Sequence, residues 1–280
     1  MLVKLFRHDF RAHSRMQIPV LIAIAAAAVL GFFNMLFLAG TGSGQLISEE
    51  SDGYVLMLGA AISGTFLIFL ALGIAMAVMS VLIFVRFYRS MVTDEAYLTF
   101  TLPVTAGQLI GAKFLASAVW FLIGSAALAI AGGLIYSGAI LAGGGDFREA
   151  MVDLWQEVFE LLAENPLTTF LLILCAVAAA VRWYFQITGA ILFGASVVRK
   201  NKALAAVGMI FAVNFLVNLI TSIFPTLGIF GFGVLFTGMV EFYDFNLNTW
   251  LLVQTGISVI LAAMFWWLSV RIAKKSVNIE

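Results

Sequence analysis

Residues 54–85 read YVLMLGAAISGTFLIFLALGIAMAVMSVLIFV, a run without a single charged side chain. A bilayer has a hydrocarbon core about 30 Å thick, which about 20 helical residues can cross. This run is therefore long enough to span a membrane, and similar runs recur along the whole chain. We predict membrane spans at 17–39, 54–87, 106–141, 167–198, 203–240 and 247–270.

The composition agrees with this prediction. Of the 280 residues, 63% are hydrophobic and 11% are charged, whereas soluble domains contain about 25% charged residues. The mean hydropathy of +1.08 leaves too little polar surface to coat a soluble globule. We therefore predict an all-α membrane protein with six transmembrane helices, forming one transmembrane domain over residues 1–280. The zero net charge argues against a nucleic-acid partner, and the single cysteine, Cys175, excludes a disulfide framework.

Charged residues indicate how the spans are oriented. Most Lys and Arg residues lie near the two termini and in the loops after the second and fourth spans, whereas most acidic residues lie in the other loops. Short cytoplasmic loops of membrane proteins are enriched in Lys and Arg. This distribution predicts that both termini and the loops near 90–112 and 199–202 are cytoplasmic, which favours an even number of spans.

Residues 1–16 form an amphipathic basic segment. Its two opposite faces carry Leu2, Phe6, Phe10 and His13 on one side, and Lys4, Arg7, Arg11 and Arg15 on the other. This pattern predicts a helix in the inner membrane interface, with its basic face toward anionic lipid headgroups. A simple positive-inside anchor is the alternative. Because the first apolar run is too long for a signal peptide, we expect no cleavage here.

Two further segments depart from simple spans. Residues 143–165 place apolar residues at helical spacing opposite an acidic face, which predicts an external amphipathic helix that caps the mouth of the protein or lies on the outer leaflet. A substrate-reading role for it is the alternative. In the fifth run, Pro225 precedes several glycines. We predict a span to about Phe224, then a broken or re-entrant segment toward Glu241.

Small residues four apart suit close packing between membrane helices. Pairs such as Gly59/Ser63, Ala60/Gly64 and Gly73/Ala77 fit this pattern. In a chain so rich in Gly and Ala they are weak signals of which helices touch.

The loop over 90–105 is predicted to be cytoplasmic, yet it is dense in apolar and aromatic residues. These residues are Tyr97, Leu98, Phe100 and Leu102. An exposed apolar patch of this kind marks a partner surface, or it dips into the lipid interface. Pro103 disfavours helix just before it, and Thr105 with Gln108 forms a capping box that begins the third span. We therefore expect a short helix near 94–101, a break, and a return to the membrane.

The string DEAYLTFTLPVT at 94–105 resembles the intracellular coupling segment of type-two ABC exporter permeases, particularly those of bacterial drug- and peptide-export systems. Those permeases typically carry RFYR…DEGYLxFTLPVS, followed by a Gln-Leu pair and a basic residue. The corresponding positions here are RFYR at 86–89, Gln108-Leu109 and Lys113. Ala96 replaces the expected glycine, and Thr105 replaces a common serine.

This resemblance implies the permease subunit of an ATP-binding-cassette exporter in a bacterial cytoplasmic membrane. Such permeases pair with a second copy or a homologue and bind two separate ATPase subunits. The residues that would contact the ATPase are Asp94, Glu95, Tyr97, Leu98, Phe100, Leu102 and Pro103. Because no phosphate-binding loop of the form G-x-x-x-x-G-K-[ST] occurs, we expect no enzymatic activity and no cofactor in this chain, with ATP and Mg²⁺ on the partner.

One basic residue, Arg182, lies in the middle of a predicted span, about 24 Å from either end. A charge at such a depth usually faces a cavity, a partner or a substrate. No predicted span contains an acidic residue, so we expect Gln186, Asn214 and Asn218 as polar neighbours. We interpret these four residues as candidates for the translocation path. Local snorkelling with hydrogen bonds between helices is the alternative.

Two other functions are weighed against an exporter. A non-transporting membrane scaffold or sensor fits the same topology. An intramembrane enzyme is less favoured, because its chemistry requires paired acids, a metal cluster or a nucleophile with its base. The predicted spans contain no acidic residue, and no histidine follows His13. The sequence does not identify the transported substrate.

Overall fold

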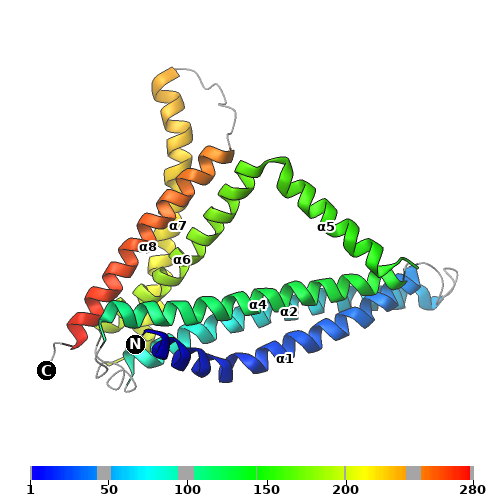
Figure 1. The fold of residues 1–280 in the computed structure, drawn as a ribbon, viewed down its shortest axis with the longest axis horizontal. Coiled ribbons are helices and arrows are strands. Elements are labelled where there is room, and N and C mark those ends of the chain that lie inside the picture. The colour runs from blue at the N-terminus through cyan, green and yellow to red at the C-terminus, as the bar shows by residue number, and fades with distance from the viewer. Residues whose placement is uncertain are drawn as a thin grey trace. The chain divides into compact units, whose positions relative to one another are not determined.

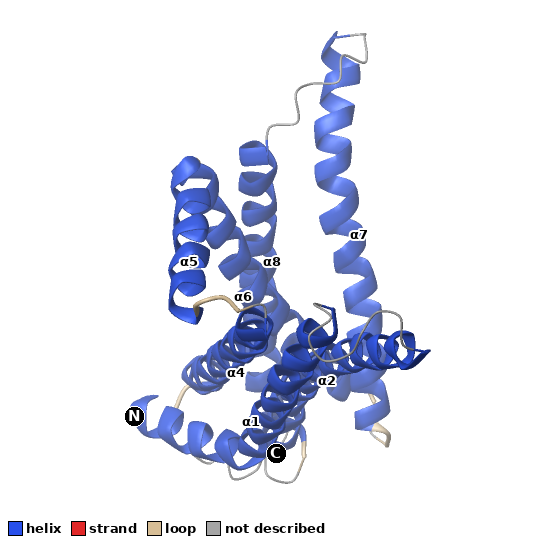
Figure 2. Ribbon diagram, turned by 90° about the vertical axis from the view of Figure 1, so that its right-hand side faces the viewer, coloured by secondary structure: helices blue, strands red, loops and turns tan. Residues whose placement is uncertain are grey.

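The computed structural model describes residues 2–42, 52–93, 104–142, 144–198, 200–237 and 247–277. Every regular element in these ranges is an α-helix (Figures 1 and 2). The helices are α1 (Leu2–Gly42), α2 (Asp52–Val92), α4 (Ala106–Ala142), α5 (Phe147–Glu164), α6 (Pro166–Val197), α7 (Lys202–Thr237) and α8 (Leu247–Val277).

All of these helices except α5 are long and apolar enough to cross a membrane, which confirms six candidate spans. Helices α1 and α2 each contain 41 residues. At 1.5 Å per residue each is about 60 Å long, roughly twice the thickness of the hydrocarbon core. Such helices tilt in the bilayer or project from it. Which side of a membrane each end faces stays a prediction.

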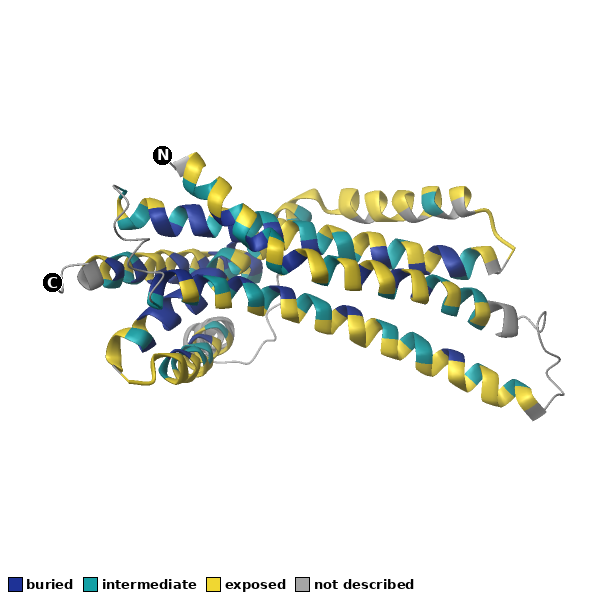
Figure 3. Ribbon diagram, turned by 90° about the horizontal axis from the view of Figure 1, so that it is seen from below, coloured by how far each residue is buried: buried dark blue, intermediate teal, exposed yellow. Residues whose placement is uncertain are grey.

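The surface of the long helices is apolar. Leu56 and Phe66 on α2, for example, are 77% and 68% exposed. Figure 3 shows exposed positions recurring along every helix. Lipid tails solvate such side chains as well as a protein core does, so this surface is that of a helical membrane protein.

The chain divides into two compact units. The first comprises residues 1–85 and 112–160, and the second comprises residues 86–111 and 161–280. Each unit therefore takes part of α2 and part of α4. The single transmembrane domain over residues 1–280 stays a prediction.

In the first unit, α1, α2 and α4 lie side by side (Figure 1). Gln17 of α1 donates to the carbonyl of Met79 on α2, and Asn34, further along α1, donates to Thr65, which lies earlier on α2. Helices α1 and α2 are therefore antiparallel. Helix α4 runs parallel to α1. The buried core shared by the three helices is formed by Ile24, Ala28, Leu72, Met79, Ala131 and Ile135.

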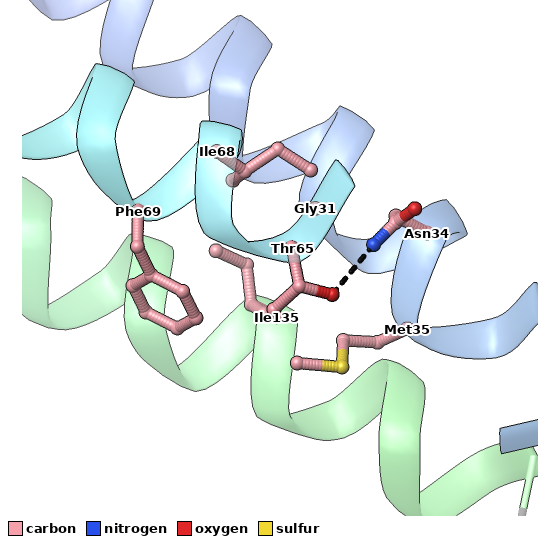
Figure 4. Close-up of a pocket in the computed structure, with 7 residues that line it drawn as sticks. All are labelled: Gly31, Asn34, Met35, Thr65, Ile68, Phe69 and Ile135. Carbon is pink, nitrogen blue, oxygen red and sulfur yellow. Dashed lines mark hydrogen bonds between the residues drawn. The ribbon is translucent and has the colours of Figure 1, made fainter. Parts of the chain in front are cut away.

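Close approach within this unit is made where side chains are small or polar. A Cβ atom on Gly138 of α4 would lie 2.5 Å from the carbonyl oxygen of Phe32 on α1. Asn34 donates to the Ala61 carbonyl at 3.1 Å and to Thr65 Oγ1 at 2.8 Å, which joins α1 to α2. Beside this contact the side chains leave a small gap between the helices (Figure 4). It is lined by Gly31, Asn34, Met35, Thr65, Ile68, Phe69 and Ile135.

In the second unit, α6 packs against both α7 and α8, which contact each other less. Gly189 lies against Phe265 and Ser269 of α8, and a Cβ atom on this glycine would lie 3.3 Å from each of the two side chains. Near the other end of the same pair, Thr168 Oγ1 donates to Asn248 Oδ1 at 2.8 Å. Helices α6 and α8 are therefore parallel. Helix α7 is antiparallel to α6. In each unit, the second of the three long helices therefore runs opposite to the other two.

One prediction about helix breaks needs correction, and another is only partly tested. Residues 2–16 are helical and continue without interruption through Pro19 into the first span, and their interfacial position stays a prediction. A bend is visible in the N-terminal part of α1 (Figure 1), as expected where proline cannot donate its backbone hydrogen bond. The break predicted after Phe224 is not observed, since α7 remains helical past Pro225 to Thr237. Residues 238–241 of the predicted re-entrant segment lie outside the described residues.

Candidate functional site

The segment that resembles a coupling helix is bounded by two well-defined helix ends. At the end of α2, Thr93 Oγ1 donates to the carbonyl of Arg89 at 2.6 Å. At the start of α4, the Gln108 backbone N–H donates to Thr105 Oγ1, and the Thr105 N–H donates to Gln108 Oε1, both at 3.3 Å. This reciprocal pair is the predicted capping box. It satisfies backbone donors that the first turn of a helix leaves unpaired.

Both of these helix ends belong to the second unit. The ring of Phe87 on α2 packs edge-on against Tyr184 of α6, with 6.5 Å between ring centroids. Gly107 on α4 lies near Trp266 of α8, whose ring is 3.9 Å from the position of a Cβ atom. The helix ends on either side of 94–103 are thus packed on α6 and α8. The predicted ATPase contacts themselves lie outside the described residues: Asp94, Glu95, Tyr97, Leu98, Phe100, Leu102 and Pro103.

Three of the four polar residues predicted for the fourth and fifth spans form a connected network. Arg182 Nη1 donates to Gln186 Oε1 at 2.9 Å, one turn along α6. Gln186 Nε2 then donates to Asn214 Oδ1 of α7 at 2.5 Å. Gln186 is only 2% exposed, and its two hydrogen bonds orient its amide. The network therefore joins α6 to α7 through a buried amide.

Asn218 does not belong to this network. Its side chain is exposed on α7, and its backbone carbonyl accepts from Thr221 Oγ1 at 3.3 Å. Helices α6 and α7 are antiparallel, with Gln186 beside Asn214 and Gly194 beside Ala205. Continued along both helices, this register brings Asn218 to the level of Arg182.

Polar contacts in the N-terminal segment were missed by the sequence reasoning. Lys113 of α4 donates to Asp9 of α1 at 3.4 Å, and the side chains are only 7% and 9% exposed. The Phe10 ring stacks on Trp120, with 5.2 Å between centroids, and Trp120 Nε1 donates to the Phe10 carbonyl at 3.2 Å.

A signal for this packed face was present in the sequence. Asp9, His13 and Gln17 recur every four residues, which places them on one face of a helix. All three are buried, and Gln17 Nε2 donates to the Met79 carbonyl of α2 at 3.0 Å. The predicted basic face is exposed, in agreement with expectation, at Lys4, Arg7, Arg11 and Arg15. That this face lies on lipid stays a prediction.

Helix α5 confirms a helix within residues 143–165. Trp155 and Phe159, one turn apart, are 58% and 64% exposed, and their ring centroids lie 6.0 Å apart. Gly144, which precedes the helix, has a φ of 76°, a backbone conformation that glycine adopts without steric cost. The external position of α5 stays a prediction.

Within the described residues, no group of three His, Cys, Asp or Glu side chains could hold a metal ion. No protein-family model matches this chain, and neither a curated protein nor a solved structure matches it.

Proposed function

We propose that this chain is the permease subunit of an ATP-binding-cassette exporter, coupled to separate ATPase subunits through residues 94–103. The observation that carries the proposal is the string DEAYLTFTLPVT at 94–105, with its flanking RFYR at 86–89. Six helices able to cross a membrane supply the remaining requirement for a permease.

The packing of the flanks supports a coupling role. A short segment held between two long helices transmits a displacement to both of them, because α-helices are stiff along their axes. Here the end of α2 packs on Tyr184 of α6, and the start of α4 lies near Trp266 of α8. A partner that moves the 94–103 segment therefore moves helix ends that belong to the same compact unit as Arg182.

In this proposal the chain pairs with a second permease copy or homologue, and two ATPase subunits bind on the cytoplasmic side of a bacterial inner membrane. The translocation path includes Arg182, Gln186, Asn214 and Asn218. ATP hydrolysis takes place on the partner subunits, so this chain provides the path and the mechanical link. Export is the direction implied by the family that the segment resembles.

Capture of an ATPase tests the proposal. The tagged chain is expressed with its genomic neighbours, solubilised in a non-ionic detergent and purified, and copurifying ATPase is quantified by mass spectrometry and by ATP hydrolysis. We expect an ATPase with a phosphate-binding loop to copurify with the wild-type chain. Tyr97→Asp, Leu98→Asp and Leu102→Asp should each abolish capture, because each places a charge in an apolar contact.

The matched control uses exposed apolar residues on α5, Trp155→Asp and Val158→Asp, which are 58% and 39% exposed in the parent chain. These variants should retain the ATPase, since α5 is predicted to lie on the opposite side of the membrane. Failure to capture any ATPase, or retention of the ATPase by all three loop variants, contradicts the coupling assignment and favours a membrane scaffold or sensor.

A further inference from the structure

Within the described part of the chain, the guanidinium of Arg182 has no carboxylate as an ion-pair partner. Among the described residues, no acidic side chain lies within 4.0 Å of it. Its Nε atom is buried and makes no hydrogen bond in the described part of the chain. A desolvated, unpaired donor on a charged group is costly, so the positive charge of Arg182 is poorly compensated within the described residues.

The network behind Arg182 holds the guanidinium in place. Asn214 accepts from Gln186 Nε2, so Gln186 presents its carbonyl oxygen to Arg182 Nη1. Gln186 accepts only from Nη1. Among the described residues, no protein group accepts a hydrogen bond from Nη2 of Arg182. A planar arginine fixed at one nitrogen is preorganised to bind a phosphate or carboxylate with the others.

The surroundings of this charge are apolar and exposed. Trp183, next to Arg182, is 38% exposed. On α7, Phe211 and Phe215 flank Asn214 in the sequence and are 72% and 66% exposed. Asn218, at the level of Arg182 on the antiparallel helix, adds an exposed amide. The pair of helices α6 and α7 thus carries a cationic group, an exposed amide and exposed apolar side chains.

We propose that Arg182, positioned by Gln186 and Asn214 and assisted by Asn218, binds the anionic head group of an amphiphile. The head group is a phosphate or carboxylate, and the apolar part of the amphiphile lies along the exposed side chains of α6 and α7. A membrane phospholipid and a free amphiphile share this chemistry. If the chain is a permease, the free amphiphile is a candidate substrate, but binding itself does not depend on the proposed function.

Binding is tested on the purified full chain in a non-ionic detergent, without an ATPase. The probes are dioctanoyl phosphatidylglycerol, dioctanoyl phosphatidylcholine and dodecyl phosphate. Apparent dissociation constants come from the rise in unfolding temperature with probe concentration. We expect an anionic probe to stabilise the wild-type chain, and phosphatidylcholine of the same chain length to stabilise it much less.

The variants separate a binding role from a structural one. Arg182→Gln should weaken anionic binding roughly 10-fold or more, because it removes charge-assisted hydrogen bonds. Arg182→Lys, which keeps the charge but loses the planar donor array, should be intermediate, and Asn218→Leu should weaken binding less than Arg182→Gln does. Arg148→Gln on α5 removes a basic side chain that is exposed and should leave binding unchanged.

Without a probe, Arg182→Gln should unfold at the same temperature as the parent or a higher one, since an uncompensated charge has been removed. Stabilisation by phosphatidylglycerol that depends on Arg182 supports a lipid site, and stabilisation by dodecyl phosphate alone supports a site for a free amphiphile. Three outcomes would overturn the proposal. The anionic probes stabilise wild type and Arg182→Gln equally, neither anion stabilises the wild-type chain, or both Arg182→Gln and Arg182→Lys unfold at a lower temperature without a probe. None of these outcomes bears on ATPase capture.

Discussion

The close approach between α6 and α7 predicts a large effect from one methyl group. A Cβ atom on Gly194 would lie 2.6 Å from the Ala205 carbonyl oxygen and 2.9 Å from Ala206 Cα. Both neighbours are backbone atoms, so no change of rotamer relieves the contact. The Gly194→Ala variant must separate the two helices by several tenths of an ångström, at the end of α6 nearest the hairpin that leads into α7.

The magnitude follows from two opposing terms. Overpacking of a close contact costs about 1–3 kcal/mol, whereas alanine in a helix is favoured over glycine by up to about 1 kcal/mol. We expect Gly194→Ala to lower the free energy of unfolding by about 1–2 kcal/mol. Gly208→Ala on α7 is the matched control, because a Cβ atom there meets nothing within 4 Å. It should be neutral or stabilising by up to about 1 kcal/mol.

The assay is thermal unfolding of both variants in the same detergent, followed by fluorescence-detected size-exclusion chromatography. A difference of about 2 kcal/mol corresponds to roughly 4–8 °C in unfolding temperature for a chain of this size class. Gly194→Ala should therefore unfold several degrees below Gly208→Ala. If the two variants unfold together, or in the reverse order, α6 and α7 do not approach each other closely at Gly194.

Three further predictions concern contacts within one unit. Asp9→Asn leaves Lys113 buried without its anionic partner and should lower the free energy of unfolding by about 3–5 kcal/mol. Replacing both Asp9 and Lys113 by leucine should recover most of this loss. If a double-mutant cycle of unfolding free energies shows no coupling between the two positions, the ion pair is refuted. Asn34→Leu removes hydrogen bonds between α1 and α2 and should cost about 0.6–1.7 kcal/mol, while Asn218→Leu, at an exposed amide, should change stability little; equal losses would count against the Asn34 contact. Thr105→Ala removes a helix cap worth about 1 kcal/mol, so hydrogen exchange should accelerate in the first turn of α4 and not in its middle; unchanged exchange there would refute the cap.

The existence and bounds of the long helices could be predicted because the information is local. The predicted span 106–141 agrees to within one residue with α4 over Ala106–Ala142. The predicted span 167–198 agrees equally well with α6 over Pro166–Val197. Inside a bilayer the backbone has to satisfy its own hydrogen bonds, so an apolar run of sufficient length becomes a helix whatever its neighbours are. The capping box at Thr105 is local in the same sense.

Which glycines lie at helix contacts could not be predicted, because this depends on how helices pair. Gly59 and Gly73, chosen for their spacing, meet nothing within 4 Å when a Cβ atom is added. Gly64 does lie at a contact, since a Cβ atom added to it would be 2.7 Å from Asn34 Oδ1. Among the described glycines, the tightest contacts to backbone atoms of another helix are at Gly138 and Gly194, which were not among the predicted pairs.

The buried ion pair was missed for a related reason. Asp9 and Lys113 are separated by 104 positions in the chain, and the local pattern around Asp9 is dominated by the basic residues of the opposite helix face. The prediction for residues 1–16 rests on the apolar and basic faces and assigns no partner to Asp9. Its burial depends on α4 lying parallel to α1, and hydrophobicity alone does not specify that arrangement.

Of the polar contacts on α6 and α7, some follow from sequence spacing within one helix and others depend on the register between the two helices. Gln186 follows Arg182 by one helical turn, so their hydrogen bond could be expected from spacing alone. Asn214 and Asn218 have equal claims by sequence, since either faces α6 in some register. The antiparallel register assigns Asn214 to Gln186 and leaves Asn218 exposed at the level of Arg182. The packing satisfies the Asn214 amide and leaves the Asn218 amide exposed, so a requirement for helix association accounts for Gln186 and Asn214 and not for Asn218.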